Sequence, residues 1–152
     1  MEPVRSQKQV EFEVAGHARH EAGLDLVVPF TTPDLTRIAL AAANRMGAGL
    51  DAVVRVVKVQ VVPFPMEPDQ SPVYVDFLRR QLEQFQSRLP ITGEIRLARE
   101  LEPGLRGTLH DDSVVLLATR KRPWRTRTER LAAWLIRAGH KVIVVSEGVE
   151  SA

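Results

Sequence analysis

The stretch LDLVVPFTTPD at residues 24–34 joins a strand to a helix, and this junction decides the fold class. Residues 24–30 form an apolar run that is typical of a strand buried on both faces. Thr32 then offers a hydroxyl for a helix N-cap, Pro33 suits the first helical position, and Asp34 places an acid in the first turn. The sequence therefore predicts a buried strand that leads directly into a helix.

Strands and helices alternate along the rest of the chain. Apolar and β-branched runs predict further strands at residues 10–14, 50–64, 91–97, 113–119 and 141–145. Helical spacing and start signals predict helices at residues 33–46, 73–88, 102–109 and 126–138. Such alternation predicts a five-stranded parallel sheet with helices on both faces, preceded by an extra N-terminal strand. Polar residues within 50–64 (Arg55, Lys58 and Gln60) predict that one end of this strand projects beyond the sheet.

Length and composition indicate one α/β domain at residues 24–146, with an N-terminal extension at 1–23 and a frayed tail at 147–152. The 152 residues include no cysteine, which excludes disulfides and thiolate metal sites. No apolar run approaches the length of about 18 residues that a membrane-spanning helix needs. We expect a cytoplasmic protein without membrane insertion.

Positive charge is concentrated in one part of the chain. Residues 120–130 contain six basic residues and one acid, a local charge of +5, although the whole chain carries only +2. In a parallel α/β fold this segment connects a strand to a helix at the sheet edge where ligands bind. Local charge of this density is typical of a binding site or docking patch.

The basic segment predicts an anion site. Side chains rather than backbone amides would bind the anion, because the segment contains no glycine that would bring backbone amides to a phosphate. Arginine forks match phosphate oxygens, and hydroxyls at the end of the first parallel strand are expected to face the same cleft. A solvated arginine-rich turn, with Thr32 acting only as a helix cap, is the alternative interpretation. The candidate nucleotide- or anion-binding residues are Thr31, Thr32, Thr119, Arg120, Lys121, Arg122, Arg125 and Thr126.

The sequence predicts neither a catalytic centre nor a metal site. His17 and His20 have ligand-like spacing, but only Glu21 stands nearby as a third ligand. Ser113 opens a strand without the flanking glycines of a nucleophile elbow. We therefore expect a protein that is not an enzyme.

Three segments in order carry a resemblance to a known family. They are residues 26–57, a β-α-β unit; residues 112–117, an acid followed by an apolar strand; and residues 131–145, a helix running into a Val-Ile-Val-Val strand. Together they resemble the universal stress protein family, and also the stress-protein-like domains of some amino-acid permeases. The resemblance implies a homodimer that pairs through the last strand, at Val142, Ile143, Val144 and Val145.

The chain departs from this family where the family binds ATP. Nucleotide-binding members carry an acid after the first strand, and this chain has Thr31 and Thr32 instead. The family's glycine-x-x-glycine loop is replaced by a segment that begins at Ala118 and continues with basic residues. The resemblance therefore implies no ATP cofactor, and leaves another nucleotide or a small anion as the expected ligand.

Two functions follow from these observations. One is a non-enzymatic, homodimeric stress-protein-like domain with a basic anion-binding patch. The other is a module that binds a polyanion, either nucleic acid or a phosphate-bearing partner, because Trp124 interrupts the basic run as a possible stacking group.

Overall fold

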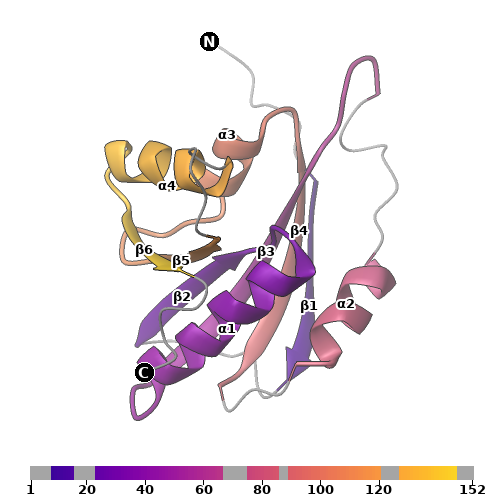
Figure 1. Ribbon diagram of the computed structural model, residues 1–152. Coiled ribbons are helices and arrows are strands. Elements are labelled where there is room, and N and C mark those ends of the chain that lie inside the picture. The colour runs from indigo at the N-terminus through magenta and orange to yellow at the C-terminus, as the bar shows by residue number, and fades with distance from the viewer. Residues whose placement is uncertain (1–7, 16–22, 67–74, 86–88, 121–126, 147–152) are drawn as a thin grey trace.

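The computed structural model describes residues 8–15, 23–66, 75–85, 89–120 and 127–146. They form one β-sheet with helices on both faces (Figure 1). The elements follow the chain as β1 (Lys8–Ala15), β2 (Leu24–Pro29), α1 (Pro33–Gly47), β3 (Ala52–Val61), α2 (Val75–Glu83), β4 (Ile91–Ala98), α3 (Leu101–Arg106), β5 (Val114–Thr119), α4 (Arg127–Arg137) and β6 (Lys141–Ser146).

The sheet has the strand order β1-β4-β3-β2-β5-β6. The five strands from β2 to β6 in the chain run parallel to one another, and β1 pairs antiparallel with β4 at one edge. The predicted fold class is confirmed: an α/β fold with five parallel strands and an extra N-terminal strand. The order reverses between β2 and β5, so this pair forms the topological switch point of the sheet.

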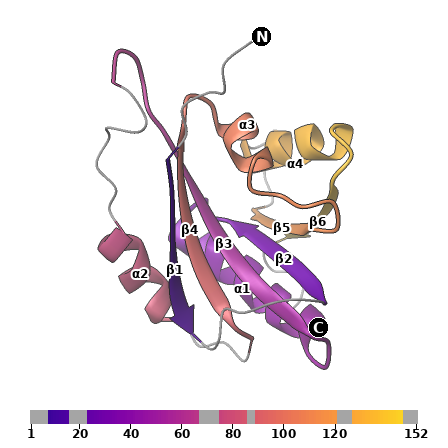
Figure 2. The ribbon, with the colours of Figure 1, turned by 180° about the vertical axis from the view of Figure 1, so that it is seen from behind.

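Each face of the sheet has its own apolar core, because neighbouring residues of a buried strand point to opposite faces. Leu26 and Val54 belong to the core on the side of α1 and α2. Val27 and Val57 belong to the core on the side of α3 and α4. Figure 2 shows the two helix pairs on opposite sides of the sheet. This two-sided burial explains why the central strands read as continuous apolar runs.

The start of α1 follows the predicted signals. The Thr32 hydroxyl accepts a hydrogen bond of 3.2 Å from the backbone N–H of Leu35, and Pro33 is the first helical residue. Deeper in the first turn, the buried Thr36 hydroxyl accepts a hydrogen bond from the backbone N–H of Thr31. These bonds fix the path of the chain between β2 and α1. This junction lies at the edge of the sheet that the carboxyl ends of the parallel strands form.

The strand β3 projects beyond its neighbour β2, but not beyond the sheet as predicted. Pairing of β3 with β2 ends at Val57, whereas pairing with β4 continues to Val61. The extension rises with β4 above the rest of the sheet in Figure 1. Arg55, one of the polar residues on which that prediction rested, lies instead among the buried residues of the sheet, where two carboxylates pair with its guanidinium.

The helix α2 is shorter than the predicted span of residues 73–88. It ends at Glu83, and the backbone N–H of Phe85 donates to the carbonyl of Leu82 in a turn. Leu78 and Leu82 are buried, but the neighbouring Phe77 is 57% exposed. The helical spacing identified α2 correctly, but only a narrow stripe of it contacts the sheet. None of the helices in the described ranges is long and apolar enough to cross a membrane.

Candidate functional site

The carboxyl ends of the parallel strands form the edge where an open α/β sheet binds ligands. One cavity lies at this edge and a second lies between two helices on the face of the sheet, and Phe30, just after β2, contributes to the lining of both. The second cavity lies between α1 and α2, and we call it the α1–α2 cavity. The other lies between the ends of β2 and β3 and the helices α3 and α4, and we call it the carboxyl-edge cavity.

The carboxyl-edge cavity has a volume of about 390 Å³, within the range of about 300–1,000 Å³ that small-molecule sites occupy. Four separate segments of the chain line it: the β2–α1 junction, the end of β3, α3, and the first turns of α4. Its lining residues are Pro29, Phe30, Thr31, Thr32, Leu35, Val57, Lys58, Val59, Val61, Leu101, Leu105, Arg127, Thr128 and Leu131. The described residues contribute hydroxyls, two cations, the Phe30 ring and aliphatic side chains to this lining, but no carboxylate.

Both cations of this cavity are available to a ligand. The ammonium of Lys58 lies 5.5 Å from the centre of the Phe30 ring, and this contact holds it at the cavity. Arg127 is exposed at the first residue of α4. Within the part of the chain that the structure describes, neither side chain forms an ion pair with a carboxylate. The cavity therefore carries uncompensated positive charge.

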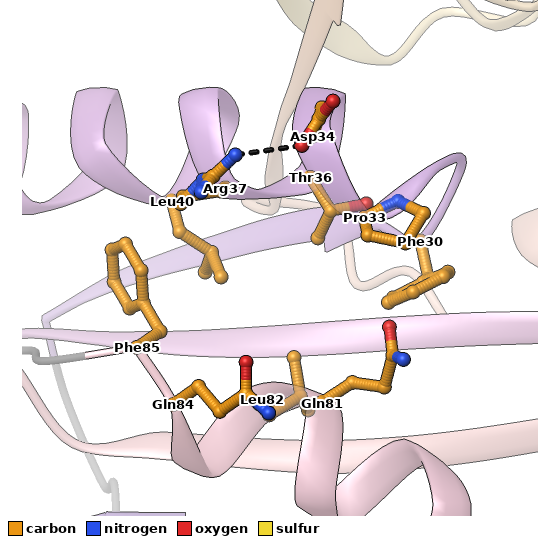
Figure 3. A pocket seen from close by; sticks show the side chains of 10 residues that line it. All are labelled: Phe30, Pro33, Asp34, Thr36, Arg37, Leu40, Gln81, Leu82, Gln84 and Phe85. Carbon is orange, nitrogen blue, oxygen red and sulfur yellow. Dashed lines mark hydrogen bonds and ion pairs between the residues drawn. The ribbon is translucent and has the colours of Figure 1, made fainter.

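The α1–α2 cavity has a different chemistry. Its volume is about 270 Å³, and Figure 3 shows the rings of Phe30 and Phe85 at its two ends. The amide side chains of Gln81 and Gln84 reach from α2 toward α1. Asp34 also belongs to its lining, so an anion would meet a carboxylate there. This cavity suits a neutral, hydrogen-bonding group better than an anion.

The carboxylate of Asp34 is already paired with two guanidinium groups. Arg37, one helical turn later, donates to one oxygen at 2.6 Å, and Arg120, after β5, donates to the other at 3.5 Å. The second contact crosses the switch point from β5 to α1. Arg120 therefore lies at the predicted place, but a residue of the chain itself takes up part of its charge.

The predicted site residues separate into three groups. Thr31 and Thr32 line the carboxyl-edge cavity. Thr119 is buried at the end of β5, outside the lining of either cavity, and Arg120 pairs with Asp34. The others, Lys121, Arg122, Arg125 and Thr126, lie outside the described residues together with Trp124.

Sequence reasoning missed three polar residues of the carboxyl-edge cavity: Lys58, Arg127 and Thr128. Lys58 was visible as a charge inside a valine-rich strand, and it lies in the part of β3 that projects beyond β2. Arg127 was visible as a cation in the first turn of a helix, where Asp and Glu are the favoured residues. Lys58 departs from the apolar pattern of its strand, and Arg127 departs from the preference for acids in the first turn of a helix. Such departures are typical of functional positions.

A buried charge network on the α3–α4 face of the sheet was also missed. Arg55 forms a two-pronged ion pair with Asp25, with both N–O distances at 2.9 Å, and contacts Glu94 at 3.3 Å. Arg96 contacts the other oxygen of Glu94 at 3.3 Å. Ser113 donates a hydrogen bond of 2.5 Å to Asp25. The network joins β2, β3 and β4 to the residue before β5.

Burial by itself would raise the pKa of Asp25, since it removes water from the carboxylate. Hydrogen bonds from Arg55 and Ser113 and the positive charge of Arg55 outweigh this effect and hold the pKa of Asp25 below its ordinary value. Ser113 is 1% exposed, and neither cavity reaches it. Its hydroxyl oxygen also accepts a hydrogen bond from the backbone N–H of His110. These groups join neighbouring strands through hydrogen bonds and ion pairs.

Metal-binding side chains do not gather in the described ranges: no three or more His, Asp or Glu residues lie close enough together there to hold an ion. His17 and His20, the only pair with ligand-like spacing in the sequence analysis, fall outside those ranges.

Comparison with protein-family models gave no match, and comparison with curated proteins gave none either. The resemblance to the universal stress protein family therefore stays a prediction, based on the three segments named above and on the fold class.

Proposed function

We propose that this chain is a non-enzymatic binding domain for a small anion, which it holds in the carboxyl-edge cavity. The observation that carries the proposal is the pair of cations, Lys58 and Arg127, that line a cavity to which the described residues contribute no carboxylate. Hydroxyls of Thr31, Thr32 and Thr128 provide further hydrogen bonds at the same place. An anion bound there would satisfy charges that the described residues leave unpaired.

The proposal includes membership of the universal stress protein family, as a divergent member. The switch point between β2 and β5 and the position of the cavity beside it support this assignment. ATP stays outside the proposal, because Thr31 and Thr32 replace the acidic residue of nucleotide-binding members and the family's glycine loop is absent. We further propose a cytoplasmic homodimer that pairs through β6, the strand at the parallel edge of the described sheet.

The proposed function is tested by calorimetric titration of the intact chain with sulfate, AMP and ATP at low and moderate salt. We expect saturable 1:1 binding of an anion that falls at least tenfold in the double variant Lys58→Gln with Arg127→Gln. The matched control is Arg137→Gln, which removes an exposed arginine from the other end of the same helix. Equal binding by the double variant and the control would contradict the proposed site.

The polyanion alternative rests mainly on residues 121–126, which the structure does not describe. The same titration separates it from the proposal when a single-stranded oligonucleotide is added as a ligand. A polyanion module binds more tightly as the oligonucleotide lengthens and loses affinity steeply with salt, because bound counterions are released. A small-anion site shows saturation with a mononucleotide or sulfate and no dependence on length.

A further inference from the structure

The aliphatic side chains of the carboxyl-edge cavity form a continuous wall. The wall is made by Val57, Val59, Val61, Leu101, Leu105 and Leu131. Its members range from fully buried (Leu105, 0% exposed) to half-exposed (Val61, 49%). The cavity thus leads from solvent down to the core between the sheet and the helices α3 and α4.

Two charged side chains of the described residues line this cavity, and they come from different elements. Lys58 belongs to the projecting end of β3, and Arg127 belongs to the first residue of α4. Among the described residues, no asparagine, glutamine, aspartate or glutamate belongs to the lining, and the other hydroxyls and charges there come from three threonines and the two cations. The site therefore combines positive charge with an apolar wall and few hydrogen-bonding groups.

We propose that the ligand of this site is an apolar carboxylic acid, an inference that rests on the proposed function. Its carboxylate pairs with Lys58 and Arg127, and its hydrocarbon body lies along the aliphatic wall. Guanidinium and ammonium groups match a carboxylate in charge and in hydrogen bonding. Removal of hydrocarbon and aliphatic wall from water then adds affinity in proportion to the apolar area covered.

The lining also explains why a nucleotide fits this cavity less well. A ribose and a base carry several donors and acceptors that must find partners when they leave water. Side chains that recognise such groups are carboxylates and amides, and the described part of the chain contributes none of them to the lining. An apolar acid has one polar group, its carboxylate. Lys58 and Arg127, which form no ion pair with a described carboxylate, are the partners that this group needs.

The chain length of the acid provides the test. The probes are straight-chain carboxylates from acetate to decanoate, each below its micelle concentration, titrated calorimetrically into the intact chain. We expect 1:1 binding whose affinity rises with each added methylene, by about fourfold at most. Decanol and decylammonium, which have the same body without the negative charge, are expected to bind at least tenfold more weakly than decanoate.

Amino-acid substitutions test whether decanoate binds in the carboxyl-edge cavity. Lys58→Gln with Arg127→Gln is expected to weaken decanoate at least tenfold, and Val61→Asp, which places a negative charge in the wall at a half-exposed position, is expected to do the same. The matched control for Val61→Asp is Leu50→Asp, at a position 55% exposed and outside both cavities. Melting temperatures of all variants show whether each one folds.

The outcomes distinguish this inference from the proposed function. Binding of sulfate and acetate with no gain along the carboxylate series would overturn the inference and leave an anion site. Tighter binding of AMP than of decanoate, with the same dependence on Lys58 and Arg127, would also overturn it. Failure of every anion to bind would remove the proposed function as well.

Discussion

Arg55 shows how a single residue in this fold serves several strands at once. Its guanidinium lies between Asp25 of β2 and Glu94 of β4, and both carboxylates are buried. Removing three charges from water costs free energy, and the close geometry of the contacts offsets that cost. A buried network of this kind is weak evidence for added stability, but the loss of one partner leaves charge uncompensated inside the protein.

The substitution Asp25→Asn is predicted to lower the free energy of unfolding at pH 7 by about 3 kcal/mol, because it leaves part of the Arg55 charge without a partner. Urea unfolding measures the change. Since the pKa of Asp25 in the folded protein lies below its ordinary value of 3.8, its contribution is fully present above about pH 3.8 and is lost as the pH falls through the folded pKa. The difference between wild type and variant should shrink in that acid range.

The control for this prediction is Asp111→Asn, in the same turn as His110 but exposed to solvent. It is expected to change the free energy of unfolding by less than about 0.5 kcal/mol. A difference between wild type and Asp25→Asn that stays constant down to pH 2 would contradict the lowered pKa.

Arg127 occupies a position that helix electrostatics disfavour. The amino end of a helix carries partial positive charge, so a cation in the first turn lowers stability by a few tenths of a kcal/mol. Natural proteins retain such costs at sites that bind ligands. The proposed anion site would account for the position of Arg127, whereas the stability of α4 does not.

The substitution Arg127→Gln is predicted to raise the free energy of unfolding by about 0.3 kcal/mol without ligand, whereas Arg137→Gln, in the last turn of α4, lowers it by a similar amount. Unfolding in urea at low salt compares the two variants. High salt is expected to remove most of the difference, since it screens exposed charges. Equal changes of the same sign would contradict the explanation.

Among the elements, the position of α3 on the sheet depends on one close contact, at Gly104. A methyl group at Gly104 would lie 2.8 Å from the Cβ of Ala98 and 2.9 Å from a methyl of Val59. Both neighbours belong to strands and have little freedom to move. The absence of a side chain at Gly104 therefore lets α3 lie directly on β3 and β4, and places Leu101 and Leu105 in the wall of the carboxyl-edge cavity.

The substitution Gly104→Ala is predicted to destabilise the protein by about 1–3 kcal/mol, because overpacking forces α3 away from the sheet. The matched control is Gly107→Ala, whose added methyl would meet the flexible end of Arg96 at 3.1 Å and is expected to cost less. Thermal unfolding of both variants measures the difference. Equal stability of the two variants would show that α3 shifts without cost.

At the scale of the whole molecule, the two edges of the sheet are different. The antiparallel strand β1 forms one edge and the parallel strand β6 forms the other. Val144 on β6 is 43% exposed, and Ile136 on the adjacent helix α4 is 55% exposed. An edge strand with apolar side chains and unpaired backbone groups is a surface on which a second strand can pair. This surface supports the proposed homodimer.

The substitution Val144→Lys is predicted to raise the dissociation constant of the homodimer at least tenfold, because it places a charge at the centre of the proposed interface. Sedimentation at micromolar concentration measures the mass. Leu50→Lys, also at an exposed apolar position but outside β6, is the control and should leave the mass unchanged. A wild-type chain that is monomeric at this concentration would contradict the proposal.

The order and the type of the elements were predictable, since their signals are local. The start of α1 shows this well: the Thr32 cap and Pro33 stand within a few residues of the bonds they make. The end of α2 was not predictable, because it depends on how much of the helix reaches the sheet. The antiparallel partner of β1 was not predictable either, because β4 is about 80 residues away in the chain.

The sequence by itself determined an α/β fold with five parallel strands, because apolar runs, helix caps and β-branched density act over a few residues. It also indicated the edge of the sheet where a ligand would bind. Only the tertiary structure decided which charges stay free: it paired Arg55 with Asp25 and Arg120 with Asp34, and left Lys58 and Arg127 at one cavity. The physical reason is that charges and cavity walls are brought together by contacts between segments far apart in the chain.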